Sequence, residues 1–164
     1  MEIYPWVVLV HVVSAFTFVL VHGVSAFVPF RVRSEPDRVR IAALLDLSGS
    51  SLTLTFVSLG VAVLSGIAAA IMGGHFSQFW PWAAIAVLIA VSGVMTPMAT
   101  YPLTAIRRAI GQPNRDDKKK GIVPEPLTDA EIATLRAGLR PELAAAVGFA
   151  GLVILIWLME AKPF

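Results

Sequence analysis

Two histidines lie inside the first apolar stretch of the chain. His11 and His22 fall within residues 3–30, where 28 consecutive residues include no Lys, Arg, Asp or Glu. About 20 apolar residues suffice to cross a bilayer, so residues 3–30 are long enough to span one. Because an ionisable side chain is costly in hydrocarbon, a histidine inside a membrane span is a functional-site hypothesis by default.

The spacing of the histidines decides which chemistry they can share. His11 and His22 lie about 16 Å apart along a helix, so they cannot bind one metal ion together. His75 follows the second apolar stretch. We expect it on the same side of the membrane as His11, with Met72 at the same level. The sequence therefore predicts His11, His75 and Met72 as candidate metal ligands.

Two cofactors suit these residue types. Haem b could lie between helices near the outer side, with His11 as one axial ligand and His75 or Met72 as the other. Copper is the alternative, because imidazole and thioether groups both bind it. Each histidine could instead form a hydrogen bond with a hydroxyl or carbonyl of a neighbouring helix. We name His11, His22 and His75 as candidate cofactor-binding residues, and we identify no catalytic residue.

Four apolar stretches must position these side chains. We expect transmembrane helices at about residues 5–30, 47–72, 82–105 and 142–159. The middle two come from a run of residues without formal charge that leaves room for two spans. Gly73 and Gly74 are expected to end one of them, and Pro81 suits the first turn of the next. With 57% hydrophobic residues, the chain of 164 residues is expected to form one domain, an all-α, polytopic membrane four-helix bundle.

Basic residues predict the orientation in the membrane. Arg and Lys number four in residues 31–40 and eight in residues 107–140, against one near the C-terminus. Because cytoplasmic loops carry an excess of Lys and Arg, we expect loops 31–46 and 106–141 in the cytoplasm and both termini outside. The N-terminus has no basic region before its apolar run, so we expect no signal peptide. We expect a multi-pass protein of the bacterial cytoplasmic membrane.

The second cytoplasmic loop is expected to contain one short amphipathic helix. Residues 112–126 are rich in Pro, Gly and charge, which favours a mobile loop. Thr128 and Glu131 then form the T-x-x-E pattern of a capping box. Because Ile132 and Leu135 share one face of the helix that follows, we expect it to lie against the membrane or the end of the bundle.

Polar side chains of the first two spans gather on single faces. At about 100° per residue, one stripe of the first span contains His11, Ser14, Phe18, His22, Ser25 and Pro29. The second span has a similar stripe of Ser51, Thr55, Ser58, Ala62, Ser65 and Ala69. Beside it, small residues recur every four positions, which lets helices approach closely. We expect both stripes, together with Ser92 and Thr96 of the third span, to face the inside of the bundle.

Several short motifs carry a resemblance to a known family. They are His11, Ser14-Ala15, His22-Gly23, the basic loop after Phe30, Ser65-Gly66 and the ending Leu158-Met159-Glu160-Ala161-Lys162-Pro163. In these the chain resembles the uncharacterised small four-span bacterial membrane proteins related to the transmembrane domain of copper-resistance protein D. The resemblance implies an early histidine in the first span, which His11 matches. The wider group includes a four-span protoporphyrinogen oxidase that uses a lysine in its third span, and this chain has none there.

We interpret the chain as a small, non-enzymatic membrane protein that binds haem b or copper through His11. The alternatives are a membrane redox enzyme, either haem-dependent or porphyrin-oxidising, and an accessory subunit of a larger membrane complex. The expected partners are the lipid bilayer and a membrane protein or a second copy of the chain, and nothing in the sequence indicates nucleic-acid binding. The absence of cysteine excludes thiolate metal sites and covalent haem attachment through C-x-x-C-H.

Overall fold

Four helices of the structure, a computed structural model that describes residues 2–163, are long and apolar enough to cross a membrane. They are α1 (Tyr4–Ser34), α2 (Arg38–Met72), α3 (Trp80–Ala109) and α6 (Pro141–Ala161). Helices are the only regular secondary structure among the described residues. By the length and composition of these helices, the chain is a multi-pass membrane protein of the all-α class.

Proline and glycine set the ends of the long helices. Pro81 lies in the first turn of α3, where the missing backbone N–H leaves no hydrogen bond unmade. α2 ends at Gly73, and Gly74 takes a left-handed conformation with φ of 66° before the short 3-10 helix η1 (His75–Ser77). The predicted connection between the second and third spans is therefore confirmed. Pro97 and Pro102 lie within α3, which continues through both of them.

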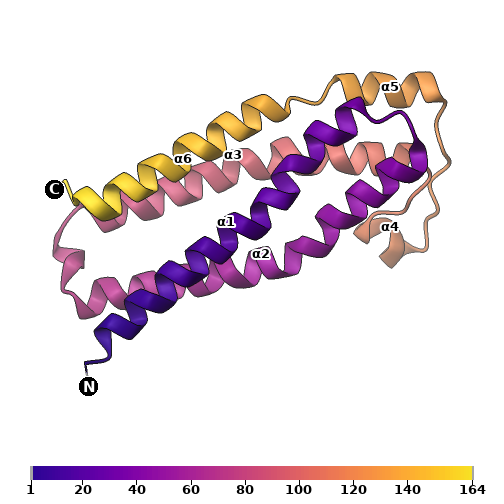
Figure 1. The fold of residues 1–164 in the computed structure, drawn as a ribbon. Coiled ribbons are helices and arrows are strands. Elements are labelled where there is room, and N and C mark those ends of the chain that lie inside the picture. The colour runs from indigo at the N-terminus through magenta and orange to yellow at the C-terminus, as the bar shows by residue number, and fades with distance from the viewer. Residues whose placement is uncertain (1, 164) are drawn as a thin grey trace.

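The long helices form two antiparallel pairs, α1 with α2 and α3 with α6 (Figure 1). Each pair packs closely, whereas contacts between the pairs are few and concentrate at one end. The main hydrophobic core lies at that end and contains the fully buried Val32, Ile41 and Ile106. Elsewhere the spans are open: in the most apolar window of α1, only 6% of the residues are buried. Most of each span is therefore available to lipid or to a ligand within the membrane.

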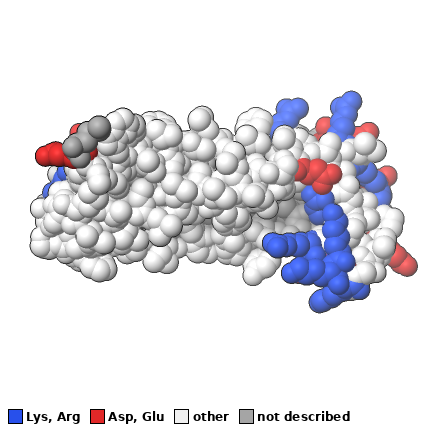
Figure 2. Space-filling view, turned by 90° about the horizontal axis from the view of Figure 1, so that it is seen from below, with Lys and Arg blue, Asp and Glu red and all other residues white. Residues whose placement is uncertain are grey.

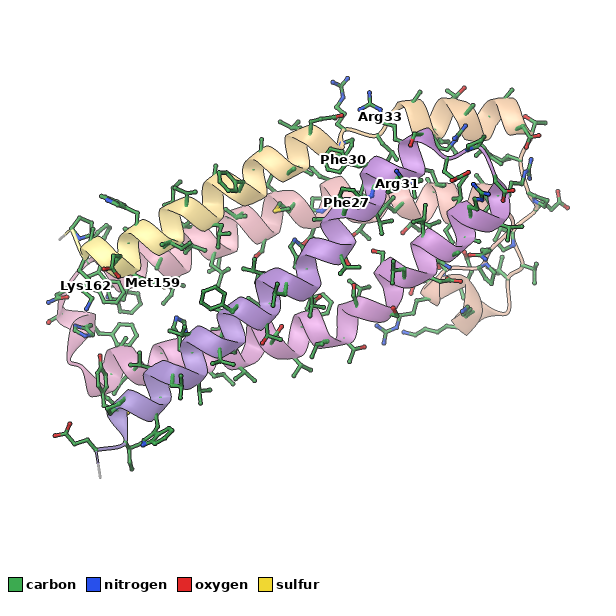
Figure 3. All side chains as sticks on the ribbon, in the orientation of Figure 1. Phe27, Phe30, Arg31, Arg33, Met159 and Lys162 are labelled. Carbon is green, nitrogen blue, oxygen red and sulfur yellow. The ribbon has the colours of Figure 1, made fainter. Side chains whose placement is uncertain are left out.

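The two ends of the bundle differ in charge. Both termini lie at one end (Figure 1), and the basic side chains gather mainly at the other (Figure 2). Figure 3 shows Met159 and Lys162 at the terminal end, with Arg31 and Arg33 at the opposite end. The chain thus places both basic loops on the same side of the four spans, as the sequence predicts for an even number of crossings.

Ion pairs connect the helices at the basic end. They are Arg33–Glu142 at 2.7 Å, Arg38–Asp129 at 2.6 Å and Arg107–Asp46 at 2.7 Å. The carboxylate of each pair is well exposed. Exposed ion pairs contribute only about 0–1 kcal/mol to stability. Their role here is to set which helix ends lie side by side, while the buried apolar core supplies the attraction.

Two shorter helices lie between α3 and α6. The prediction of a loop over residues 112–126 is wrong for the part that forms α4 (Arg115–Lys120). Asn114 caps the start of this helix and so stabilises it. The second is α5 (Asp129–Ala137). Ile132 in α5 is 3% exposed and belongs to the main core, so α5 lies against the end of the bundle.

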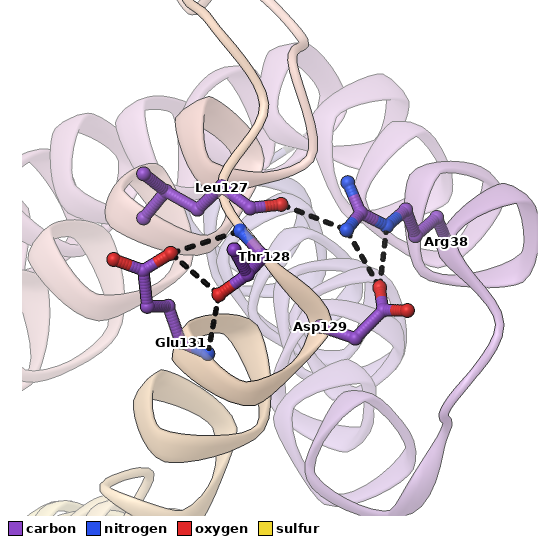
Figure 4. Close-up of polar contacts among 5 residues, drawn as sticks. All are labelled: Arg38, Leu127, Thr128, Asp129 and Glu131. Carbon is purple, nitrogen blue, oxygen red and sulfur yellow. Dashed lines mark hydrogen bonds and ion pairs between the residues drawn. The ribbon is translucent and has the colours of Figure 1, made fainter.

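The start of α5 is fixed by hydrogen bonds that Figure 4 shows. The Thr128 hydroxyl accepts from the Glu131 backbone N–H, and the Glu131 carboxylate accepts from the Thr128 N–H at 2.9 Å. The hydroxyl and then the backbone N–H of Thr128 donate to this carboxylate and lower the pKa of Glu131. Arg38 donates to the Leu127 carbonyl and to Asp129, and so joins this cap to the start of α2.

Candidate functional site

His11 lies at the contact between α1 and α2. Its Nδ1 is 2.8 Å from the backbone carbonyl oxygen of Ala62. A carbonyl oxygen can only accept, so Nδ1 carries the proton and donates it to this bond. The bond therefore selects the tautomer in which Nε2 has a free lone pair, the form that binds a metal ion.

The other ring nitrogen of His11 is unoccupied. Nε2 has no hydrogen-bond partner among the described residues. It is not one of the fully enclosed atoms of the chain, since the only buried side-chain nitrogen or oxygen without a partner in the described part is Nε of Arg136. His11 thus has one ring nitrogen that is not fully enclosed and forms no hydrogen bond with the described residues.

Gly66 makes the room for the imidazole. A Cβ atom at this position would lie 2.8 Å from Cε1 and 2.9 Å from Nδ1 of His11. Contacts this short do not occur in folded proteins, so any larger residue would displace the ring. The sequence predicts that small residues of α2 let the helices approach closely, and at Gly66 the space is filled by a side chain of α1.

The polar stripes of α1 and α2 face one another in the structure. Ser14, Thr55 and Ser58 are buried there. Each hydroxyl donates to a carbonyl of its own helix, with Ser14 at 2.7 Å from Val10 and Thr55 at 2.9 Å from Ser51. Their hydrogen-bonding needs are therefore met within each helix. These hydroxyls act as packing groups and leave no donor free for a ligand.

The polar residues of the third span lie elsewhere. Ser92 and Thr96 of α3 are exposed and line a hollow of about 540 Å³ on that helix. No contact with the stripes of α1 and α2 is recorded for them among the described residues, so the expectation that they face inward with these stripes stays a prediction. α3 uses a different face, with Val91 and Met95, to contact α6.

His22 has surroundings of a different kind. Its ring stacks on Phe18 of the same helix, with ring centres 5.2 Å apart and planes 9° apart. Neither ring nitrogen has a hydrogen-bond partner among residues 2–163. His22 is half-buried, and nothing in the described part of the chain fixes its tautomer as Ala62 does for His11.

His75 belongs to the connection between α2 and α3. Its ring lies back over Gly73, where a Cβ would be 2.6 Å from its Nε2, and its centre is 5.5 Å from that of the Trp80 ring. Lys162 lies over the same indole, 5.9 Å from a ring centre. His75 is therefore part of an aromatic cluster that joins the α2–α3 connection to the C-terminal end.

No hydrogen bond or ring contact links His11, His75 and Met72, the predicted metal ligands, among the described residues. His11 contacts α2 at Ala62 and Gly66, whereas His75 packs on Trp80 and Met72 is 48% exposed. No group of three or more His, Cys, Asp or Glu residues within the described chain could hold a metal ion. A site shared by His11, His75 and Met72 stays a prediction.

No family model matches the chain, and no curated protein or solved structure is significantly similar to it. The resemblance drawn from the short sequence motifs stays a prediction. The function must therefore be inferred from the geometry around the three histidines, and His11 alone combines a fixed tautomer with a free nitrogen.

Proposed function

We propose that the protein binds haem b within the membrane, with Nε2 of His11 as an axial ligand. The observation that carries this proposal is the 2.8 Å hydrogen bond from Nδ1 to the Ala62 carbonyl. Histidines that bind metal ions almost always donate their other ring N–H to a carbonyl, a carboxylate or water. The α1–α2 contact thus orients His11 before any ligand arrives.

The number of available ligands favours haem over copper. A porphyrin supplies four nitrogens to its iron, so the protein need provide only one or two axial ligands. A copper site draws its set of ligands from the protein, typically two histidines with a further side chain. No group of three or more His, Cys, Asp or Glu residues in the described part of the chain could supply such a set. One oriented histidine therefore suits haem b better.

The haem proposal is tested by the absorption spectrum of the protein expressed with a supply of haem and then purified. A Soret band is expected, and His11→Ala should lower the bound haem at least about tenfold. His22→Ala is the matched control, because it removes an imidazole from the same helix without touching Ala62 or Gly66.

An equal Soret band in His11→Ala would show that this histidine is not the ligand. A protein without a Soret band that purifies with stoichiometric copper would favour the copper alternative. The absence of both cofactors from protein supplied with each would overturn the proposal and favour the accessory-subunit interpretation.

We also infer that both termini lie outside and that both basic loops lie in the cytoplasm of a bacterial cell. The gathering of Lys and Arg mainly at the end opposite the termini supports this orientation (Figure 2). His11, seven residues after the start of α1, then lies in the outer half of the membrane. Haem bound there would be closer to the outer surface than to the cytoplasm.

The orientation is tested with single cysteines, since the chain has none of its own. Ser77 lies in the exposed connection at the terminal end, and Lys119 is exposed at the basic end. A maleimide that does not cross membranes is expected to label Ser77→Cys in intact cells, and Lys119→Cys only after the membrane is opened. The reverse pattern would refute the proposed orientation.

A further inference from the structure

The basic residues of α4 have no partners. Arg115, Lys118, Lys119 and Lys120 are all exposed, and none of their side chains forms an ion pair or hydrogen bond with a described residue. Elsewhere at this end, Arg33, Arg38 and Arg107 are each matched with a carboxylate. Most of the basic side chains without an ionic partner at this end therefore lie on α4, where the exposed Asp116 offsets one of their four charges.

α4 turns its charges in opposite directions. At about 100° per residue, Arg115, Lys118 and Lys119 lie within about 100° of one another, and we call them the α4 basic face. Asp117 lies on the other side and is only 5% exposed. Its carboxylate accepts from the Asn114 backbone N–H at 3.2 Å and pairs with Arg108 at 3.4 Å. Asp117 is thus used to attach the helix, while the basic groups point outward together with the exposed Asp116, which lies beside the α4 basic face.

The same ion pair sets the depth of α4. Arg107 and Arg108 directly follow the charge-free run of residues 47–106 and so mark where the hydrocarbon ends. The pair between Arg108 and Asp117 holds α4 at this boundary, beside the ends of α2 and α3 (Figure 1). The chain then returns to α3 through a 2.8 Å hydrogen bond from Leu127 N–H to the Ala109 carbonyl. The α4 basic face therefore lies at the level of lipid headgroups.

We propose that the α4 basic face binds the headgroups of anionic phospholipids in the leaflet around the basic end. Phosphate oxygens accept strong, charge-assisted hydrogen bonds from ammonium and guanidinium groups. Basic side chains near an anionic membrane surface each strengthen binding about fivefold. The exposed Ile122, which follows α4 closely, adds an apolar side chain to this segment. This binding does not depend on whether His11 holds a cofactor.

The proposal is tested with the whole protein, purified in a neutral detergent. Its thermal unfolding is followed while phosphatidylglycerol or phosphatidylcholine is added. Phosphatidylglycerol is expected to raise the unfolding temperature more, because a ligand that binds the folded state stabilises it. The variant K118Q/K119Q should need about 25-fold more phosphatidylglycerol for the same rise.

A matched control removes two charges from the same end of the protein. Arg31 and Arg140 also have no ionic partner among the described residues, but they lie on α1 and at the start of α6. The variant R31Q/R140Q has the same net charge as K118Q/K119Q. Because a site on α4 includes neither arginine, the response of this variant to phosphatidylglycerol should stay close to that of the unaltered protein. An equal loss in both variants would mean general attraction to charge, which refutes a site on α4.

Two further results would overturn the proposal. One is an equal stabilisation by phosphatidylcholine. The other is full stabilisation by glycerol 3-phosphate, which would mean that a free phosphate, and no lipid, is the ligand. If K118Q/K119Q fails to fold, salt supplies a second measurement on the unaltered protein: 0.5 M salt should weaken the effect of phosphatidylglycerol, because it screens exposed charges. An effect that does not change with salt would refute an electrostatic site.

Discussion

Gly151→Ala is expected to destabilise the protein by about 1–3 kcal/mol, by forcing α3 and α6 apart. Gly151 is buried in this contact, and a Cβ there would lie 2.5 Å from Cγ2 and 3.0 Å from Cγ1 of Val91. Valine branches at Cβ and is held to one main rotamer in a helix, so Val91 cannot turn away. The overlap must be relieved by movement of the helix backbones, which also disturbs the packing of Leu158 on Trp80.

Two other glycines provide controls for this prediction. Gly148→Ala would place Cβ 2.8 Å from Cε and 2.9 Å from Sδ of Met95, but both atoms belong to the outer part of a flexible side chain that can move. Gly93→Ala meets nothing within 4 Å and gains up to about 1 kcal/mol of helix propensity. Thermal or denaturant unfolding in detergent should therefore rank the variants with Gly93→Ala most stable and Gly151→Ala least. A Gly151→Ala protein as stable as Gly93→Ala would show that α3 and α6 do not pack in this register.

The presence of four long helices could be predicted because it depends on local sequence. Charge-free runs, Gly73 and Pro81 set where the helices lie, and the structure follows them closely. The helix ends at the basic side could not be placed as well. The structure reduces the connection expected over residues 31–46 to residues 35–37, because Asp37 accepts from the backbone N–H groups of Val39 and Arg40 and starts α2 there. Charged residues beside a membrane can therefore belong to the long helices themselves when a capping residue such as Asp37 is available.

The pairing of the helices could not be predicted, because it depends on contacts between residues far apart in the chain. The small residues of α2 predict a packing face, and Ala62 and Gly66 on that face do meet His11 of α1. The corresponding signal in α6 is Gly148 with Gly151, which marks its contact with α3. Helix α4 was missed because its composition favours a loop, whereas its stability comes from Asn114 and Asp117 acting together as a capping box.

His11 could be selected from the sequence, since a polar ring inside an apolar span is conspicuous. Its hydrogen-bond partner could not be predicted, because the acceptor at Ala62 is a backbone carbonyl and has no signature in the sequence. The same limit applies to His75, whose expected approach to His11 assumed only that both lie at one end. In the structure the His75 ring packs on Trp80, and the spacing of residues along the sequence does not indicate this contact.

Gly66→Ala is expected to lower the haem content about 10- to 100-fold, the usual effect of removing the group that orients a metal-binding histidine. This prediction rests on the proposed haem site. The added Cβ would overlap Cε1 and Nδ1 of His11 and push the ring away from Ala62. Nδ1 then loses its acceptor, and the imidazole no longer keeps its proton on that nitrogen. The ligand is still present in this variant, so any loss of haem reports its orientation alone.

Gly60→Ala is the control on the same helix, because a Cβ at Gly60 meets nothing within 4 Å and should leave haem binding unchanged. Nitrogen NMR of the His11 ring provides a measurement that needs no cofactor. The unaltered protein should show a proton on Nδ1, whereas Gly66→Ala should show a mixture of tautomers. If Gly66→Ala keeps the proton on Nδ1, as Gly60→Ala should, the contact between His11 and Gly66 is wrong. If Gly66→Ala loses it yet binds haem at the original level, the contact is right and His11 is not the axial ligand, because the bound haem then does not depend on the orientation of this ring.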